Sequence, residues 1–230
     1  MSTIPPARLT RATIVTRGLR KAGNEAITVE ANVALNTALF DLYTIYGDWP
    51  FLATETPLTL AGSSFALPTD FLRTVDDDAL IITAIDGSPT YQLIREVPRD
   101  QFDRFRGPGA NTGVPQQWTA NRATTQGLFY PTPTQAITAR LRYQYLPPDI
   151  PTDSTGDAQV PLFPWHQYLI NVVYQFGLEY ERDGRADTQQ AKNEMALRTI
   201  RQTIRPRRQD SGTLPLDPQV FARSTFDGDV

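Results

Sequence analysis

The side chains that most often carry out chemistry are scarce in this sequence. Cysteine is absent, which excludes a disulfide framework, a thiolate zinc site and a cysteine nucleophile. The one histidine, His166, follows a tryptophan and has no evident partner, so we expect a surface or structural histidine and not a ligand or a base. The acidic run at 76–78 lacks the spacing, the glycine and the distal glutamate of a calcium loop, and it predicts a turn or a solvated edge.

Other catalytic patterns are equally thin. Gly107-Pro108-Gly109 lacks the lysine and the Ser/Thr of a phosphate-binding loop. Serine-nucleophile motifs are missing from the sequence. Glycoside hydrolysis needs only two carboxyl groups brought together by the fold, and the sequence nominates no pair. We therefore expect a protein that is not an enzyme and that has no cofactor and no catalytic or metal residues.

Positive charge is concentrated in two clusters, although the net charge of the chain is −3. Such clusters indicate either contacts with acidic partners or DNA, or simply solvated helix faces. The first cluster is Arg8, Arg11, Arg17, Arg20 and Lys21, and the second is Arg198, Arg201, Arg205, Arg207 and Arg208. From the second cluster we take Arg201, Arg205, Arg207 and Arg208 as candidate basic interface residues.

Hydropathy gives no sign of a membrane segment. Residues 1–6 are polar and contain proline, so they do not resemble a secretory signal peptide. No run approaches the roughly 18 apolar residues needed to span a bilayer. We expect a protein made and folded in a cytoplasm, with no membrane partner.

Periodicity predicts helices on both sides of a region with short strands. Helices are expected over 7–22, over 29–46 with Thr28 as its N-cap, from Pro164 to about residue 183, and from an Asp187 cap to residue 205. In the helix over 29–46, the leucines at 35, 39 and 42 lie on one apolar face with the tyrosines at 43 and 46. A short helix is also expected over 98–105.

Between residues 51 and 150, short apolar or alternating runs are separated by turn residues. The run over 137–145 alternates cleanly, which predicts a strand with one buried face. Asp86-Gly87-Ser88-Pro89 predicts a turn between two strands. The aromatic residues, including Trp49, Trp118 and Trp165, are expected to pack in cores or interfaces.

These elements predict an α+β fold with four parts. Residues 1–50 and 161–206 would be the two halves of a four-helix-bundle-like helical domain, and residues 51–160 would be a small antiparallel β module inserted between them. The 183–187 connection is short, so the last two helices should be antiparallel neighbours.

Residues 207–230 have a different character, because prolines and glycines rule out a long helix while apolar side chains recur without a period. We interpret them as an extended C-terminal arm that orders when it docks on another chain; an ordinary disordered terminus is the alternative. The candidate docking residues are Leu214, Leu216, Val220, Phe221 and Phe226.

Several segments, taken in order, resemble the bacteriophage head-to-tail adaptor family, which includes the head-completion and tail accessory proteins of podoviruses. The resemblance covers about residues 8–205 and depends on the order and spacing of the segments. They are YGDWPFL at 46–52, FALPTDFLR at 65–73, GVPQQW at 113–118, LFYPTP at 128–133, LRYQYLPP at 141–148 and VPLFPWHQYLI at 160–170.

The resemblance implies a structural protein of the virion neck. Such adaptors form a dodecameric ring beneath the portal protein, extend the DNA channel and offer a platform to the tail or nozzle protein. In several relatives the C-terminal arm runs onto the portal. Genomic DNA would pass through the channel without sequence-specific binding.

A ring needs two different complementary faces on each copy, because its contacts are head-to-tail. A channel for DNA should avoid basic walls, since phosphate contacts by Lys and Arg accumulate. We therefore expect both arginine clusters to face the portal or neighbouring subunits. Two other interpretations stay open: a virion-associated carbohydrate- or receptor-binding module, which needs an aromatic groove on the β module, and a cell-wall hydrolase, which needs facing carboxylates.

Overall fold

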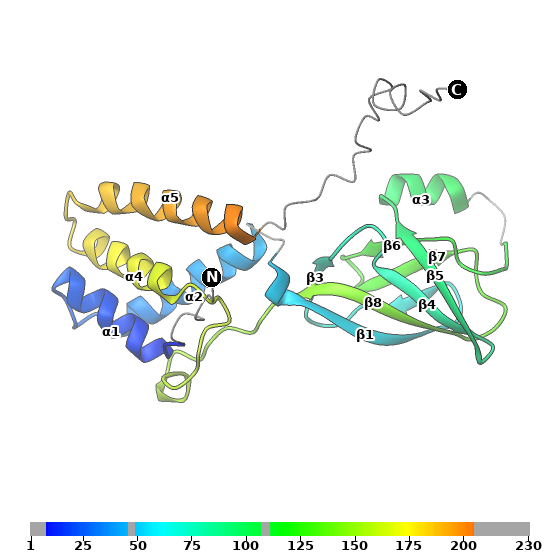
Figure 1. The fold of residues 1–230 in the computed structure, drawn as a ribbon, viewed down its shortest axis with the longest axis horizontal. Helices are drawn as coiled ribbons and strands as arrows, with labels where there is room; N and C mark the ends of the chain where they lie inside the picture. The colour runs from blue at the N-terminus through cyan, green and yellow to red at the C-terminus, as the bar shows by residue number, and fades with distance from the viewer. Residues whose placement is uncertain (1–7, 46–48, 107–110, 205–230) are drawn as a thin grey trace, which may run out of the picture.

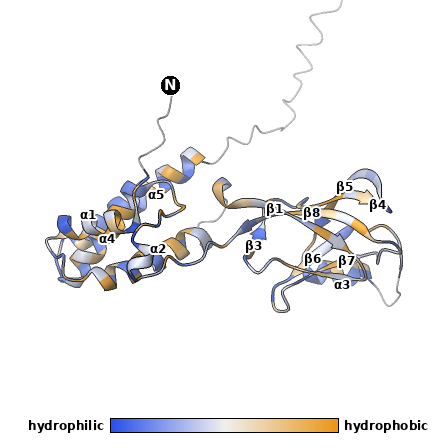
Figure 2. Cartoon of the chain, turned by 90° about the horizontal axis from the view of Figure 1, so that it is seen from below, coloured by the Kyte–Doolittle hydropathy of each residue, from blue (hydrophilic) through white to orange (hydrophobic). Residues whose placement is uncertain are grey.

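The computed structural model describes residues 8–45, 49–106 and 111–204. The described chain forms an elongated molecule with helices at one end and a sheet at the other (Figure 1). We call these parts the helical lobe and the β lobe. Apolar residues are distributed through both lobes (Figure 2), and each lobe has its own cluster of buried apolar side chains.

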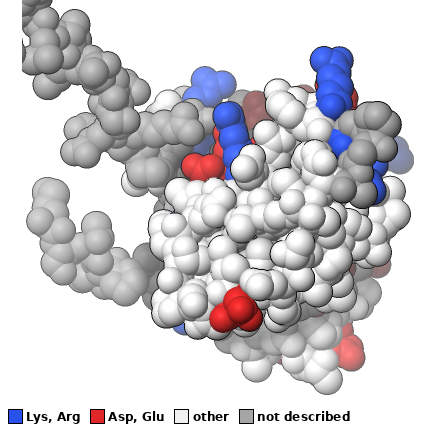
Figure 3. Space-filling model, turned by 90° about the vertical axis from the view of Figure 1, so that its right-hand side faces the viewer, with Lys and Arg blue, Asp and Glu red and all other residues white. Residues whose placement is uncertain are grey.

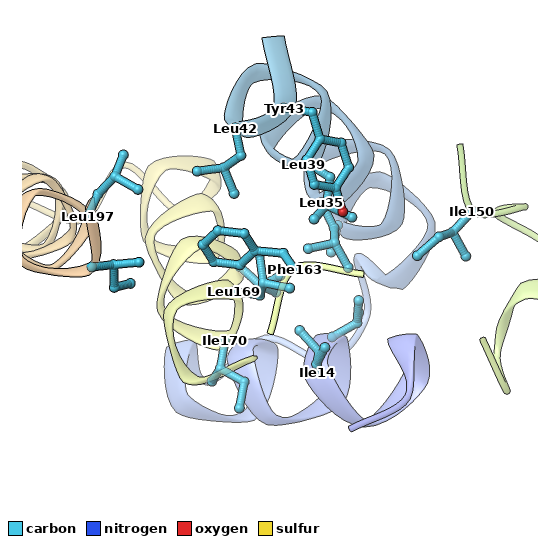
Figure 4. Close-up of a cluster of buried hydrophobic side chains, with 14 of the residues drawn as sticks. Ile14, Leu35, Leu39, Leu42, Tyr43, Ile150, Phe163, Leu169, Ile170 and Leu197 are labelled. Carbon is cyan, nitrogen blue, oxygen red and sulfur yellow. The ribbon is translucent and has the colours of Figure 1, made fainter. Parts of the chain in front are cut away.

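The helical lobe is organised around one central helix. It contains α1 (Arg11–Ala22), α2 (Thr28–Thr44), α4 (His166–Tyr180) and α5 (Ala186–Ile204). Helix α4 packs against the other three, whereas α5 packs mainly on α4. Leu35, Leu39 and Leu42 of α2 point toward Phe163 and Leu169 in the centre of this lobe (Figure 4).

Helices α1 and α4 pack closely because glycines lie where they meet. A Cβ atom added to Gly18 would lie 2.6 Å from the Cβ of Val173, and one added to Gly177 would lie 2.6 Å from the Cβ of Ala22. Both distances are far below an ordinary carbon–carbon contact of about 3.5–4.0 Å. The absence of a side chain at these two positions therefore sets the distance between the helices.

The helix ends follow the expected chemistry in part. Gly23 adopts a left-handed conformation (φ 83°) and ends α1, as predicted. Thr28 is the first residue of α2 and not its N-cap, and its Oγ1 donates a hydrogen bond to the carbonyl of Glu25. Helix α4 begins after Trp165 and not at Pro164. Asp183, not Asp187, accepts a hydrogen bond from the backbone N–H of Arg185 just before α5.

The β lobe contains eight strands and one helix. The strands are β1 (Ala53–Leu60), β2 (Ser64–Ala66), β3 (Phe71–Thr74), β4 (Leu80–Ile85), β5 (Ser88–Glu96), β6 (Gln117–Asn121), β7 (Gln126–Tyr130) and β8 (Ile137–Tyr145). They form one sheet with the order β1-β8-β4-β5-β6-β7-β2, and β3 pairs with β8. Helix α3 (Arg99–Arg106) and two 3₁₀ turns, η1 (Pro50–Leu52) and η2 (Ser154–Gly156), complete the described elements.

Sequence signals within the sheet are confirmed. Asp86 and Gly87 both have positive φ angles (48° and 73°) and form the turn between β4 and β5. Strand β8 alternates between buried and more exposed positions over its first half, and its inward side chains meet Trp118, Phe65 and Phe129 in the core. The rings of Phe65 and Trp118 lie 5.8 Å apart.

The predicted fold class is wrong. The sheet is not a small antiparallel module: it has eight strands, β5 and β6 pair in parallel, and its end strands β1 and β2 are consecutive in the chain, so it curls into a nearly closed barrel. Strands outnumber α-helices in the described residues, eight to five. Helix α5 packs on the outer side of α4, and its Leu197 and Ile200 join the core of the helical lobe from there. The runs at 64–66 and 71–74 are strands of three and four residues, which are too short to show an alternating pattern in the sequence.

Candidate interaction surface

The outward side of α2 carries large apolar side chains among polar ones. Val29, Val33 and Phe40 are 66%, 53% and 48% exposed, and their spacings of four and seven residues place them on one helix face. The helix has two charged residues, Glu30 and Asp41. Thr28 and Thr37 are also exposed, so this side of the helix is mixed. Exposed valine and phenylalanine side chains that share one helix face nevertheless indicate a place where a neighbour can pack.

The apolar surface extends from α2 onto α4 at one end. Val29, Val33 and Ala34 line a shallow groove together with Phe176 and Tyr180 of α4. The rings of Phe176 and Tyr180 lie 6.2 Å apart and line the α4 side of this groove. Because most of the lining is apolar, the groove suits an apolar side chain better than a polar ligand.

At the other end, Phe40 borders a second hollow. This hollow lies between α2 and the segment over 146–162, and its wall includes the half-exposed side chains of Val160 and Leu162. Between the two hollows, Val33 and Phe40 line a third one together with the polar side chains of Asn36, Thr37, Asp149 and Thr152, so the apolar residues form a strip with a polar stretch in its middle. We call it the α2 face, and it consists of Val29, Val33, Ala34, Phe40, Val160, Leu162, Phe176 and Tyr180.

Buried and hydrogen-bonded residues at the inner side and the end of α2 hold this helix in place. Tyr43 is buried, and that burial raises the pKa of its phenol well above the usual range, so the ring stays neutral. Trp49 Nε1 donates a 2.7 Å hydrogen bond to the carbonyl of Leu42. Arg73 of β3 donates from Nη2 to the carbonyls of Tyr43 and Thr44 at 3.2 and 2.6 Å. The end of α2 is thereby attached to the β lobe.

Two polar side chains hold the segment that borders the α2 face. Arg11 of α1 is buried, and its guanidinium donates to the carbonyls of Pro151 and Asp153 and to the carboxylate of Asp157. His166 accepts the backbone N–H of Leu9 at Nδ1 (2.6 Å), and its Nε2 lies 3.3 Å from the carbonyl oxygen of Pro161. Proton placement follows from these partners: the neutral ring would carry its hydrogen on Nε2.

Ion pairs connect neighbouring segments on the outer surface of the β lobe. Glu55 of β1 pairs with Arg140 and Arg142 of β8, at 3.9 and 3.1 Å, and Arg142 also lies 3.8 Å from Asp76. Asp77 pairs with Arg95 at 3.6 Å. Seen from its far end, the β lobe is covered mainly by uncharged residues, with most charges near the edge of the view (Figure 3).

The sequence-predicted site residues mostly lie outside the described residues. This applies to the docking residues Leu214, Leu216, Val220, Phe221 and Phe226, and to Arg205, Arg207 and Arg208. Arg201 lies near the end of α5, is partly exposed and has a partner. In the first cluster, Arg11 is a buried structural residue and Arg20 pairs with Glu25. The structure thus brings no predicted set together.

Catalytic and ligand sites find no support within the described ranges. No group of three histidine, aspartate or glutamate side chains there could hold a metal ion. The acidic run contributes Asp76 and Asp77 to ion pairs. Trp118, Phe65 and Phe129 are core residues and do not form an open aromatic groove. No helix in the same ranges is both long and apolar enough to cross a bilayer.

Sequence reasoning found the inner face of α2 and missed the outer one. Leu35, Leu39 and Leu42 were identified because they recur at helical spacing. Val29, Val33 and Phe40 recur in the same way on the opposite side. The signal that reveals them is the scarcity of charge on α2.

Of two comparisons with known proteins, one finds a match. A family model described as SU10 adaptor protein matches residues 9–218, which is most of the chain. A search of curated proteins finds no match.

Proposed function

The chain belongs to the SU10 adaptor protein family of phage adaptors, and from this premise we propose that it forms a ring in the virion neck. The ring is dodecameric and lies beneath the portal protein. It extends the DNA channel and provides the platform to which the tail or nozzle protein attaches. The protein is structural, has no enzymatic activity and works without a cofactor.

The observation that carries this proposal is the α2 face. Large apolar side chains exposed on two helices and a neighbouring segment mark a protein interface, even with the polar stretch between Val33 and Phe40. A ring supplies such an interface on every copy, because each subunit has a neighbour on both sides. Facing carboxylates or an open aromatic groove would have favoured a hydrolase or a carbohydrate-binding module instead.

We assign the parts of the chain to this architecture as follows. Residues 1–50 and 161–206 act as one helical unit, residues 51–160 as its β insertion, and residues 207–230 as an arm that docks on the portal. Leu214, Leu216, Val220, Phe221 and Phe226 supply the apolar contacts of the arm. Arg201, Arg205, Arg207 and Arg208 face the portal or a neighbouring copy, which leaves the DNA channel without strongly phosphate-binding walls.

The test is to measure the mass of the full chain alone and with the portal protein of the same virus, and to image the complex by electron microscopy. We expect a closed ring of this chain bound coaxially to the portal. A chain that stays monomeric and does not bind the portal would contradict the proposal. Deletion of residues 207–230 should abolish or strongly weaken portal binding, and unchanged binding would show that the arm does not dock there.

A further inference from the structure

We infer that the α2 face of one copy binds the outward side of α5 on the next copy. This inference rests on the proposed ring and names the two surfaces that would form its repeated contact. The occupant of the α2 face is therefore a second copy of this chain.

The outward side of α5 presents an apolar centre with two basic side chains and one acidic side chain around it. Met195 is 70% exposed, and Ala191 and Thr199, one helical turn before and after it, are exposed and small. Lys192 and Arg198 lie three residues to either side of Met195, and the exposed Glu194 lies next to it. A flexible methionine is well suited to fill a shallow apolar groove such as the one lined by Phe176 and Tyr180.

The two surfaces lie on different sides of the helical lobe. Helix α4 separates α5 from α1 and α2, and α5 has no extensive contact with α2 (Figure 4). One copy can therefore offer its α2 face to one neighbour and its α5 surface to another at the same time. This arrangement is heterologous, and a repeated heterologous contact closes into a ring when its rotation divides a full circle.

Charge favours this pairing over a symmetric one. Both charged residues of α2, Glu30 and Asp41, are acidic, and neither forms an ion pair within the described ranges. The same holds for Lys192 and Arg198 on α5, again counting described residues only. A contact of α2 with α2 would place acid against acid, whereas a contact of α2 with α5 places the two acids near two bases, Lys192 and Arg198, and one acid, Glu194.

The natural absence of cysteine makes a direct test possible. Full-length Val33→Cys protein and Met195→Cys protein are prepared separately, mixed under conditions in which the ring forms, and treated with a mild oxidant. We expect a disulfide-linked dimer in the mixture, roughly tenfold above either protein alone. Leu93→Cys, an exposed position on β5, replaces Met195→Cys in the control mixture, which should give no dimer above background.

The outcomes separate this inference from the proposed ring. If the ring forms but positions 33 and 195 do not cross-link, the inference is wrong and the ring survives. If Val33→Cys cross-links mainly to itself, α2 makes a symmetric contact; if it cross-links only to the portal or to another virion protein, the α2 face serves that partner. Both results overturn the inference. A chain that never forms a ring contradicts the inference and the proposed function together.

Charge reversal provides a second readout that does not depend on cross-linking. Lys192→Glu combined with Arg198→Glu should weaken association at least about tenfold, because acids then face acids. Glu30→Lys combined with Asp41→Lys should restore it when the two proteins are mixed. Glu30, Lys192 and Arg198 are exposed and Asp41 is partly exposed, so folding should not change. Failure of the mixture to recover association would contradict the pairing of these surfaces.

Discussion

The two lobes differ in the side chains that they expose on their outer surfaces. On the β lobe, Glu55, Arg140 and Arg142 tie neighbouring strands together from outside, and among the exposed apolar side chains that the structure describes there, only Tyr91 and Leu93 share one face of a strand. On the helical lobe, exposed apolar side chains recur along α2, on α4 and on the segment beside them, with a polar stretch in the middle. The difference indicates that the helical lobe leaves more apolar surface for a neighbour than the β lobe does.

The sharpest test of this contrast is a cavity in the core of the β lobe. Trp118→Ala removes a fully buried side chain and should lower the stability of that lobe by about 3–5 kcal/mol. Amide hydrogen exchange should accelerate in the strands far more than in α1, α2 and α4. Equal acceleration in both lobes would show that they unfold as one unit, which would contradict their description as two distinct parts.

A smaller loss is expected when Arg11 is replaced. Arg11→Met keeps much of the side-chain volume but leaves the carbonyls of Pro151 and Asp153 without their donor, at a cost of about 2–3 kcal/mol. The segment over 150–157 should become more accessible to protease while the β lobe is unaffected. Chemical denaturation and limited proteolysis measure both effects. Arg20→Met, which removes only an exposed ion pair, is the control.

Close packing within the helical lobe is tested at Gly18. Gly18→Ala forces α1 away from Val173 and should destabilise this lobe by about 1–3 kcal/mol, despite the better helix propensity of alanine. Gly184→Ala is the matched control, since a Cβ there meets nothing within 4 Å. Thermal unfolding of the two variants decides the point. A stabilising Gly18→Ala would mean that the helices do not meet as described.

The smallest effect on stability should come from the α2 face itself. Phe40→Ser removes a half-exposed ring and should change the free energy of unfolding of the isolated chain by about 0.5 kcal/mol or less. Assembly should nevertheless be strongly reduced. Denaturation of the isolated chain and mass measurement of the assembly give the two numbers. A large loss of stability would show that Phe40 already has its partner within the chain.

How much of this could be predicted from the sequence depends on how local each signal is. The Asp86-Gly87 turn, the Gly23 cap and the alternation over 137–145 are confirmed because a few neighbouring residues determine them. The parallel pairing of β5 with β6 was not predictable in this way, because it joins Arg95 to Gln117 across α3. The role of Arg11 was missed for the same reason, since its partners lie some 140 residues away.

The link between Arg73 and the last carbonyls of α2 has a mechanical consequence. A guanidinium at the C-terminal end of a helix is held by two acceptors and also by the helix dipole, so it resists pulling better than one neutral hydrogen bond would. A relative movement of β3 and α2 would have to break these charge-assisted hydrogen bonds, so Arg73 restricts how far the two lobes can turn against each other.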